Sequence, residues 1–172
     1  MDVKPTLGLD FPNLPYYIDG DLKFTESGAI MHYICAKHNP DLLGRDSAEV
    51  AMAEMASGIV GDLKGAVTGP CYMSGDKAAI KAAIDARLPA ITKFLGVKNF
   101  LAGANVTFVD FIFFELLHLC DYCTDGETLK DSTLAAYVAR VKSLNGIQAY
   151  FDSAATQGLS FNNKMAKLGG SV

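Results

Sequence analysis

The chain has 172 residues, of which 50% are hydrophobic and 20% are charged, and its formal net charge is −4. This composition is typical of a globular protein with a sizeable core and excludes a disordered chain. The acidic balance argues against broad electrostatic binding to nucleic acid or to an acidic membrane surface. Charged side chains interrupt the most apolar stretch, residues 106–120, so no membrane span is expected.

The cysteines indicate an intracellular protein with reduced thiols. Cys35, Cys71, Cys120 and Cys123 are scattered along the chain, and the first residues form neither a signal peptide nor a transit peptide. Cys120 and Cys123 have the spacing of a redox pair or of half a zinc site, but they would also share one helix face. No histidine spacing completes a zinc site, so ordinary buried thiols are favoured and no metal is expected.

The first predicted element is a short β-hairpin. Residues 16–18 and 22–24 flank Asp19-Gly20-Asp21, and Asp-Gly is a strong signal for a tight turn. A helix is predicted from about Ser27 to His38, because Ile30, Tyr33 and Ile34 recur at helical spacing. Asn39-Pro40 should end this helix, since the residue before a proline avoids the helical region.

Only helices are predicted after residue 45. Asp46 and Glu49 form a capping-box pattern that opens a long helix over residues 46–68, which Gly69-Pro70 should end. The stripe expected to face the core is Ala51, Met55, Ile59, Leu63 and Val67. Gly58, Gly61 and Gly65 dilute this helix, and such glycines often mark close packing against another backbone.

Four further helices follow, at about residues 76–95, 109–123, 134–142 and 146–155. The first should be kinked at Pro89 and capped by Gly96, and its apolar stripe is Ile80, Ile84, Leu88, Ile91 and Leu95. Thr107 and Asp110 form a capping pair for the second, which is apolar nearly all round. The tail, residues 158–172, has weak periodicity and should lie on the surface. The expected fold class is α+β by content but mostly α. A β-hairpin plus helix in residues 1–39 precedes an all-helical domain in residues 46–172.

Several motifs together resemble the cytosolic glutathione transferases, closest to the mu class and mu/sigma-like. They are Leu7-Gly-Leu-Asp-Phe-Pro-Asn-Leu-Pro-Tyr16, Asp19-Gly20, Glu26-Ser27-Gly-Ala-Ile30, Cys71-Tyr72, Phe100-Leu-Ala-Gly-Ala-Asn-Val-Thr-Phe-Val-Asp-Phe111, Ile147-Gln-Ala-Tyr150 and Lys164-Met165-Ala166. The resemblance implies that residues 1–39 are the C-terminal half of a thioredoxin-like, glutathione-binding domain. In the family, a strand–helix–strand unit with the catalytic Tyr comes before this half. Because Met1 directly precedes it here, we expect no catalytic Tyr in this chain.

The resemblance also implies a partial binding site for glutathione. Leu14-Pro15 resembles the family's cis peptide, and the Leu14 backbone, beside Asn13, would pair with the cysteinyl part of glutathione. Ser27 and its amide, next to Glu26, would bind the γ-glutamyl carboxylate at a helix N-terminus. The residues alone leave two other interpretations open: a proline turn that opens the hairpin, and a simple helix N-cap.

Further residues are assigned by the same resemblance. Lys4 matches a lysine that reaches the glycyl carboxylate, and Asp62 matches an aspartate that reaches the γ-glutamyl amine in the neighbouring subunit. Tyr72 resembles a tyrosine that assists the second substrate, and Phe11 resembles an aromatic key inserted between two helices of a partner subunit. Asp62 could equally be a solvated helix residue, and Tyr72 could equally line the bundle.

Two functions from different classes follow. The first is a dimeric, cytoplasmic glutathione transferase that conjugates glutathione to electrophiles, provided that the full protein contains the preceding catalytic unit. The second is a catalytically inactive, glutathione-transferase-like subunit of a larger, organellar or cytoskeletal assembly, whose partner would complete the hairpin.

Overall fold

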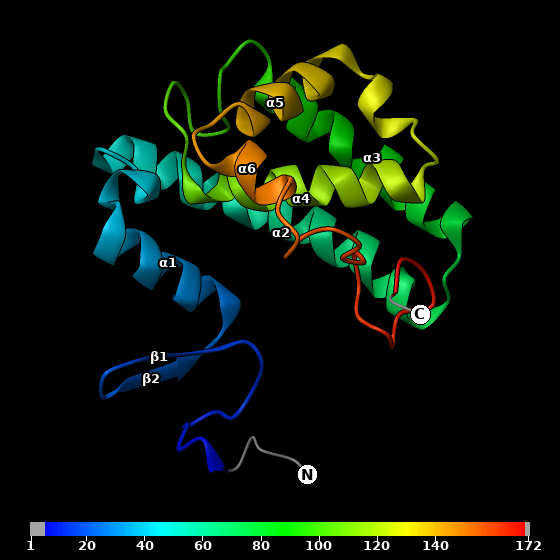
Figure 1. Cartoon of the computed structure of the whole chain (residues 1–172). Helices are drawn as coiled ribbons and strands as arrows, with labels where there is room; N and C mark the ends of the chain where they lie inside the picture. Colours follow the sequence, from blue (N-terminus) through cyan, green and yellow to red (C-terminus); the bar gives the residue numbers. More distant parts are fainter. Residues whose placement is uncertain (1–5, 171–172) are drawn as a thin grey trace.

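The computed structural model describes residues 6–170. An antiparallel hairpin, β1 (Tyr16–Asp19) and β2 (Leu22–Thr25), is followed by α1 (Ser27–His38). The other helices are α2 (Ser47–Met73), α3 (Lys77–Leu95), α4 (Phe108–Cys123), α5 (Ser132–Lys142) and α6 (Ile147–Phe151), with short 3-10 helices at Pro40–Leu43 and Thr128–Lys130. The hairpin and α1 stand at one end of a bundle in which α4 contacts α1, α2, α3 and α5 (Figure 1). The predicted, mostly helical α+β fold is confirmed.

The hairpin and α1 are joined into one body. The strands pair in a register that sets Tyr16 opposite Thr25, and the ring of Tyr33 on α1 packs against the hairpin. The carboxylate of Asp19, beside the hairpin turn, accepts a hydrogen bond from the Tyr33 hydroxyl at 2.8 Å and forms an ion pair with Lys37. Because a two-stranded hairpin is marginal in water, these contacts with α1 are what keep it folded.

The α1 unit meets the bundle at a close backbone approach. The edge of the His32 ring packs on Phe108, with ring centroids 4.6 Å apart, and His32 Nε2 lies 3.1 Å from Glu54 Oε1 on α2. Gly44, just before α2, has φ 121°, and a Cβ atom there would lie 2.5 Å from the backbone nitrogen of Val50. Only glycine allows this approach, because other residues would be strained at this φ and would clash with α2.

The predicted start of α2 is confirmed, but only Leu63 and Val67 of its predicted stripe are buried. The Asp46 carboxylate accepts hydrogen bonds from the second and third helical amides at 2.9 Å. The buried residues of α2 are Ala53, Ala56, Val60, Leu63, Val67 and Cys71. Met55 and Ile59, which were expected in the core, are 48% and 51% exposed. The helix carries two apolar stripes, and periodicity alone could not decide which of them faces the bundle.

The helix α2 also passes through Pro70 and ends at Met73, so the predicted end at Gly69-Pro70 was wrong. Pro70 removes one amide donor from the helix, yet its neighbour Cys71 is fully buried in the core. The carbonyl oxygen of Cys71 accepts hydrogen bonds from the amides of Lys167 and Leu168, at 2.9 and 3.2 Å. Packing and these contacts with the tail therefore sustain one more helical turn.

The predicted core of α3 and α4 is confirmed. All five residues of the α3 stripe are buried: Ile80, Ile84, Leu88, Ile91 and Leu95. Gly96 ends this helix with φ 52°, as the C-cap glycine was expected to do. The α4 helix buries side chains around most of its circumference, which makes it the axis of the bundle.

One buried carboxylate joins three parts of the bundle. Asp110 is fully buried, and its oxygens accept hydrogen bonds from the Leu101 amide, the Thr107 amide and the Tyr137 hydroxyl at 2.9, 2.8 and 2.8 Å. The Thr107 hydroxyl also donates to it, at 3.1 Å. Burial raises the pKa of Asp110, and these hydrogen bonds act in the opposite direction. The predicted capping pair is thus the centre of a larger network.

The last helix is shorter than predicted, and the tail does more than cover the surface. The hydroxyl groups of Ser153 and Thr156 both donate to the carbonyl oxygen of Tyr150 at 2.7 Å, and α6 ends at Phe151. Such bonds compete with continued helix formation. The tail then returns to the end of α2, where an isolated bridge joins Asn162 and Gly170.

Candidate functional site

The loop of residues 11–15 leads into β1 at the same end of the hairpin at which α1 follows β2. The Leu14-Pro15 peptide bond is cis, and Pro15 immediately precedes Tyr16, whose partner in the register is Thr25. The Thr25 hydroxyl donates to the Phe11 carbonyl oxygen at 3.0 Å, which ties the loop to the residue before Glu26. The structure therefore brings Asn13, Leu14, Pro15, Glu26 and Ser27 together at one edge of the molecule, all of them exposed.

The start of α1 is open to an anion. Glu26 occupies the N-cap position with φ 74° and ψ 114°, and its side chain makes no capping hydrogen bond. Ser27 is the first helical residue rather than the cap. A positive φ at a residue other than glycine costs about 1–3 kcal/mol, and such strain clusters at binding and catalytic sites. The exposed amides and the helix dipole together favour a negatively charged group here.

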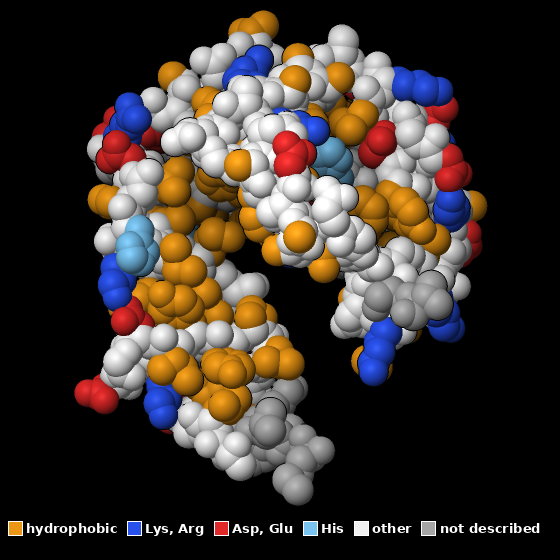
Figure 2. Space-filling model, viewed as in Figure 1, with side chains coloured by type: hydrophobic (Ala, Val, Ile, Leu, Met, Phe, Trp, Pro, Cys, Tyr) orange, Lys and Arg blue, Asp and Glu red, His pale blue; other side chains and the backbone are white. Residues whose placement is uncertain are grey.

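A large apolar cavity begins one helical turn further along α1. It has a volume of about 920 Å³ and is enclosed by residues from α1, α2, α4, α6 and the tail, including Met31, Tyr72, Phe111, Phe151 and Phe161. Met31 lies four residues after Ser27 and therefore on the same face of α1. Figure 2 shows the molecule hollowed between the hairpin end and the rest of the chain, with hydrophobic side chains on the walls.

Tyr72 lies at the end of α2, on the wall of this cavity. Its hydroxyl oxygen accepts a hydrogen bond from the Asn163 amide of the tail at 3.3 Å. The oxygen is therefore occupied as an acceptor, while its hydrogen can still be donated to a bound molecule.

Polar groups in the cavity were missed by the sequence interpretation. Glu115 and His118 were taken only as interruptions of an apolar helix, yet both line the cavity, together with Lys64. The ring of His118 packs edge-on against Phe114 at a centroid distance of 4.7 Å, and burial lowers its pKa. The signal was present in the sequence, because charged residues that share one side of an otherwise buried helix indicate an open face.

A second surface lies along α2. Met55, Ile59 and Asp62 follow one another at helical spacing and are all exposed. A Cβ atom added at Gly58, Gly61 or Gly65 would meet no other atom within 4 Å, so these glycines are not packed within this chain. Phe11, on the hairpin side, is 80% exposed. Lys4 lies outside the described residues.

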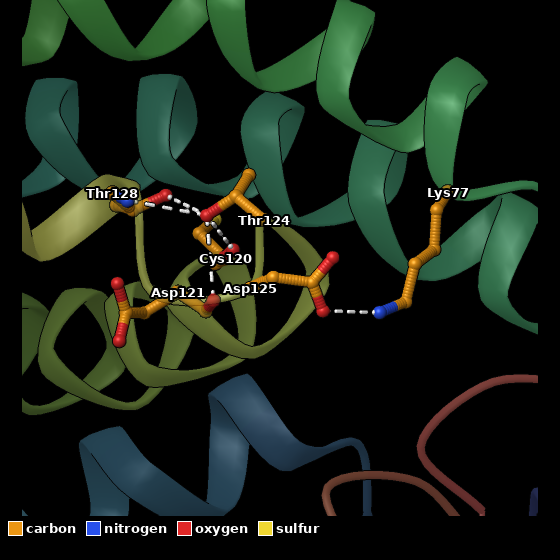
Figure 3. A network of polar contacts seen from close by, with 6 residues as sticks. All are labelled: Lys77, Cys120, Asp121, Thr124, Asp125 and Thr128. Carbon is orange, nitrogen blue, oxygen red and sulfur yellow. Dashed lines mark hydrogen bonds and ion pairs between the residues drawn. The ribbon is translucent and has the colours of Figure 1, made fainter.

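Cys120 and Cys123 lie in a buried structural region and not in an open site. Figure 3 shows the polar contacts at this end of α4: the Thr124 hydroxyl donates to the Cys120 carbonyl at 2.9 Å, and Lys77 pairs with Asp125 at 2.5 Å. Burial raises the pKa of both thiols to about 12. Among residues 6–170, no group of three or more His, Cys, Asp or Glu side chains is arranged to hold a metal ion.

These thiols should be unreactive in the folded protein. All four cysteines are buried, and only the thiolate attacks a disulfide, so a chromogenic aryl disulfide should release almost no product from the native chain. The same reagent should titrate all four thiols once the chain is unfolded in denaturant. Rapid reaction of the native protein, followed by absorbance, would contradict this expectation.

Solved structures identify the fold. The crystal structure of the glutathione S-transferase Blo t 8 matches 97% of this chain and 80% of its own, with a TM-score of 0.86 and 24% identity. A Pi-class glutathione S-transferase from Onchocerca volvulus matches 96% of this chain and 81% of its own, with a TM-score of 0.82 and 23% identity. At these identities the likeness shows the fold alone, which is that of a glutathione transferase.

Sequence comparison adds the family. Residues 66–154 match the family model "Glutathione S-transferase, C-terminal domain". Glutathione S-transferase Mu 3 from Homo sapiens is 36% identical over 174 residues, covering 98% of this chain and 76% of the human protein. Glutathione S-transferase 2 from Gallus gallus is 36% identical over 154 residues, covering 87% and 69%. The chain therefore belongs to the glutathione transferase family, with relatives in the mu class. The described helices include none that is long and apolar enough to cross a membrane.

Proposed function

We propose that this protein acts in the conjugation of glutathione to electrophiles and that the residues described above form part of its glutathione site. The observation that carries the proposal is the start of α1, where a strained Glu26 and uncapped amides adjoin the exposed loop of residues 11–15. An open helix N-terminus beside an exposed backbone edge suits a small peptide that ends in a carboxylate.

Each part of glutathione has a proposed partner. Ser27 and its amide bind the γ-glutamyl carboxylate at the start of α1. The N–H and C=O groups of Leu14, held between Asn13 and Pro15, pair with the cysteinyl backbone as a one-residue strand addition. The assignment of Lys4 to the glycyl carboxylate stays a prediction.

The chemistry requires a thiolate. A free thiol has a pKa of about 8.5, and a hydrogen bond donated to the sulfur lowers that value. We assign this activating hydroxyl to none of the tyrosines described here. Tyr16 and Tyr17 lie on β1, and Tyr72 lies at the far end of α2. The resemblance assigns activation to a strand–helix–strand unit that precedes the hairpin.

The cavity beside α1 is proposed to receive the second substrate. Its walls are mainly apolar and aromatic, which suits a hydrophobic electrophile, and Tyr72 would donate its hydroxyl hydrogen to the reacting molecule. The exposed face of α2 and Phe11 would form the contact with a second copy, and Asp62 would reach the γ-glutamyl amine bound to that copy. We further propose that this dimer works in the cytoplasm.

Substitution of Ser27 by alanine tests the proposal. Loss of one hydrogen bond to a carboxylate should weaken glutathione binding about tenfold or more, measured by titration calorimetry and by retention on immobilised glutathione. Ser47→Ala is the matched control, because Ser47 is the first residue of α2, is also exposed, and lies outside the site. Conjugation would be followed with a halogenated nitroarene.

The outcomes separate the alternatives. Failure of the unaltered protein to bind glutathione would contradict the proposal. Conjugation is tested on the protein purified from its source, because the activating unit is assigned to the segment before the hairpin; binding without conjugation by that protein would favour the inactive subunit. Equal affinities of the Ser27→Ala and Ser47→Ala variants would contradict the assignment of Ser27.

A further inference from the structure

The tail closes on itself through one buried residue, Asn162, which contributes a backbone and a side-chain hydrogen bond. The backbone N–H of Asn162 donates to the Gly169 carbonyl oxygen at 2.8 Å, and the side-chain Nδ2 of Asn162 donates to the Leu168 carbonyl oxygen at 2.9 Å. Asn162 is only 8% exposed, whereas most of its neighbours in the tail are exposed. Gly170 lies close to the backbone of the same loop at Ala166, because a Cβ atom on Gly170 would be 2.7 Å from the Ala166 carbonyl oxygen. Compact loops of this kind, with adjacent ends, are frequently functional.

The closed loop is attached to α2 and α4. The amides of Lys167 and Leu168 donate to the Cys71 carbonyl oxygen, and the Asn163 amide donates to the Tyr72 hydroxyl. The Phe161 ring packs on Tyr122 of α4, with centroids 5.1 Å apart. The segment that leads into the loop lines one wall of the cavity with Leu159, Ser160 and Phe161, and Asn162, the first residue of the loop, lines it too. The position of this wall therefore depends on how the loop is closed.

We infer that Asn162 is a positioning residue that determines which apolar molecules the cavity accepts. Its backbone and side-chain hydrogen bonds hold residues 162–170 in one closed shape. That shape determines where the adjoining residues Leu159 and Phe161 lie on the cavity wall. The inference rests on the proposed function in one respect, namely that the cavity receives the second substrate. Asn162 itself need not touch the reacting atoms.

Direct binding of aromatic probes tests the inference without requiring conjugation. Affinities of the full chain would be measured for a two-ring probe, anilinonaphthalene sulfonate, and for a one-ring probe, benzenesulfonate. Asn162→Asp keeps the shape of the side chain but removes the donor to Leu168, and Asn162→Ala removes the side chain. Both variants should change the ratio of the two affinities about tenfold, the scale on which a small change in pocket shape discriminates ligands.

Two further variants serve as an independent test and as a control. Gly170→Ala forces the loop open from its other end and should change the ratio in the same direction, even if an Asn162 variant folds poorly. Met165→Ala alters an exposed side chain of the same loop and should leave the ratio unchanged. An unchanged ratio in Asn162→Asp and Gly170→Ala, an equal change in Met165→Ala, or no probe binding by the unaltered protein would overturn the inference. A changed ratio in a protein that does not bind glutathione would uphold it and reject the proposed function.

Discussion

Replacing Asp110 by alanine should lower the free energy of unfolding by about 3–5 kcal/mol, the range observed when one member of a buried charged network is removed. The substitution leaves the buried Leu101 and Thr107 amides without their acceptor, and it leaves the Tyr137 hydroxyl only the Asp110 carbonyl oxygen, at 3.2 Å. Each unsatisfied buried donor costs about 1–3 kcal/mol. Because a domain of this size has only about 5–15 kcal/mol of stability, the variant should lose a large share of its resistance to denaturant.

Denaturant unfolding followed by circular dichroism checks this prediction. Tyr137→Phe removes one donor and should cost about 1–2 kcal/mol. Asp46→Ala is the matched control, because Asp46 also caps a helix through its carboxylate but is exposed, and its loss should cost about 1 kcal/mol. Equal losses for Asp110→Ala and Asp46→Ala would show that the buried network contributes no more than an ordinary helix cap.

Replacing Ile59 by aspartate should abolish a dimer formed through α2. The side chain is 51% exposed in the single chain and lies at the spacing of Met55 and Asp62 beside three unpacked glycines, where a partner helix could approach closely. In a two-fold interface the substitution occurs twice, so two carboxylates would be buried against apolar surface. A central residue of an interface contributes about 2–4 kcal/mol, so the dissociation constant should rise about a thousandfold.

Light scattering after size-exclusion chromatography, over a range of protein concentrations, measures the effect. Val97→Asp is the matched control, since Val97 is an exposed apolar residue outside this face and its substitution should leave the mass unchanged. Phe11→Ala should weaken the dimer less, because it removes contact area without introducing a charge. A dimeric Ile59→Asp variant, or an unaltered protein that is monomeric throughout, would reject α2 as the interface.

Local sequence signals predicted the elements that depend on local chemistry. Turn residues located the hairpin, the capping aspartates located the helix starts, and the regular spacing from Ile80 to Leu95 identified the buried face of α3. Pro70 shows the limit of such signals, because its effect on the helix is overcome by packing around Cys71 and by the returning tail. Those contacts join residues almost a hundred positions apart, and no local window contains them.

The candidate site also has one part that the sequence predicted and one part that it did not. The resemblance named the loop of residues 11–15 and the start of α1, and the hairpin register explains why these two segments are adjacent. The tail that closes the cavity was expected only to cover the surface, because its periodicity is weak. Its role depends on the side chain of Asn162 and on the one carbonyl group, that of Leu168, to which it donates, a pattern that hydrophobic spacing does not reveal.

Gly44 has a mechanical consequence for the whole molecule. The hairpin and α1 pack together as one arm, and the chain that follows this arm contacts the bundle where Gly44 lies against the backbone of Val50. Because this contact is made by main-chain atoms, substitutions of surface side chains leave it in place. The opening between the arm and the bundle is therefore set in part by main-chain atoms at its closed end, far from the residues that would touch a bound molecule.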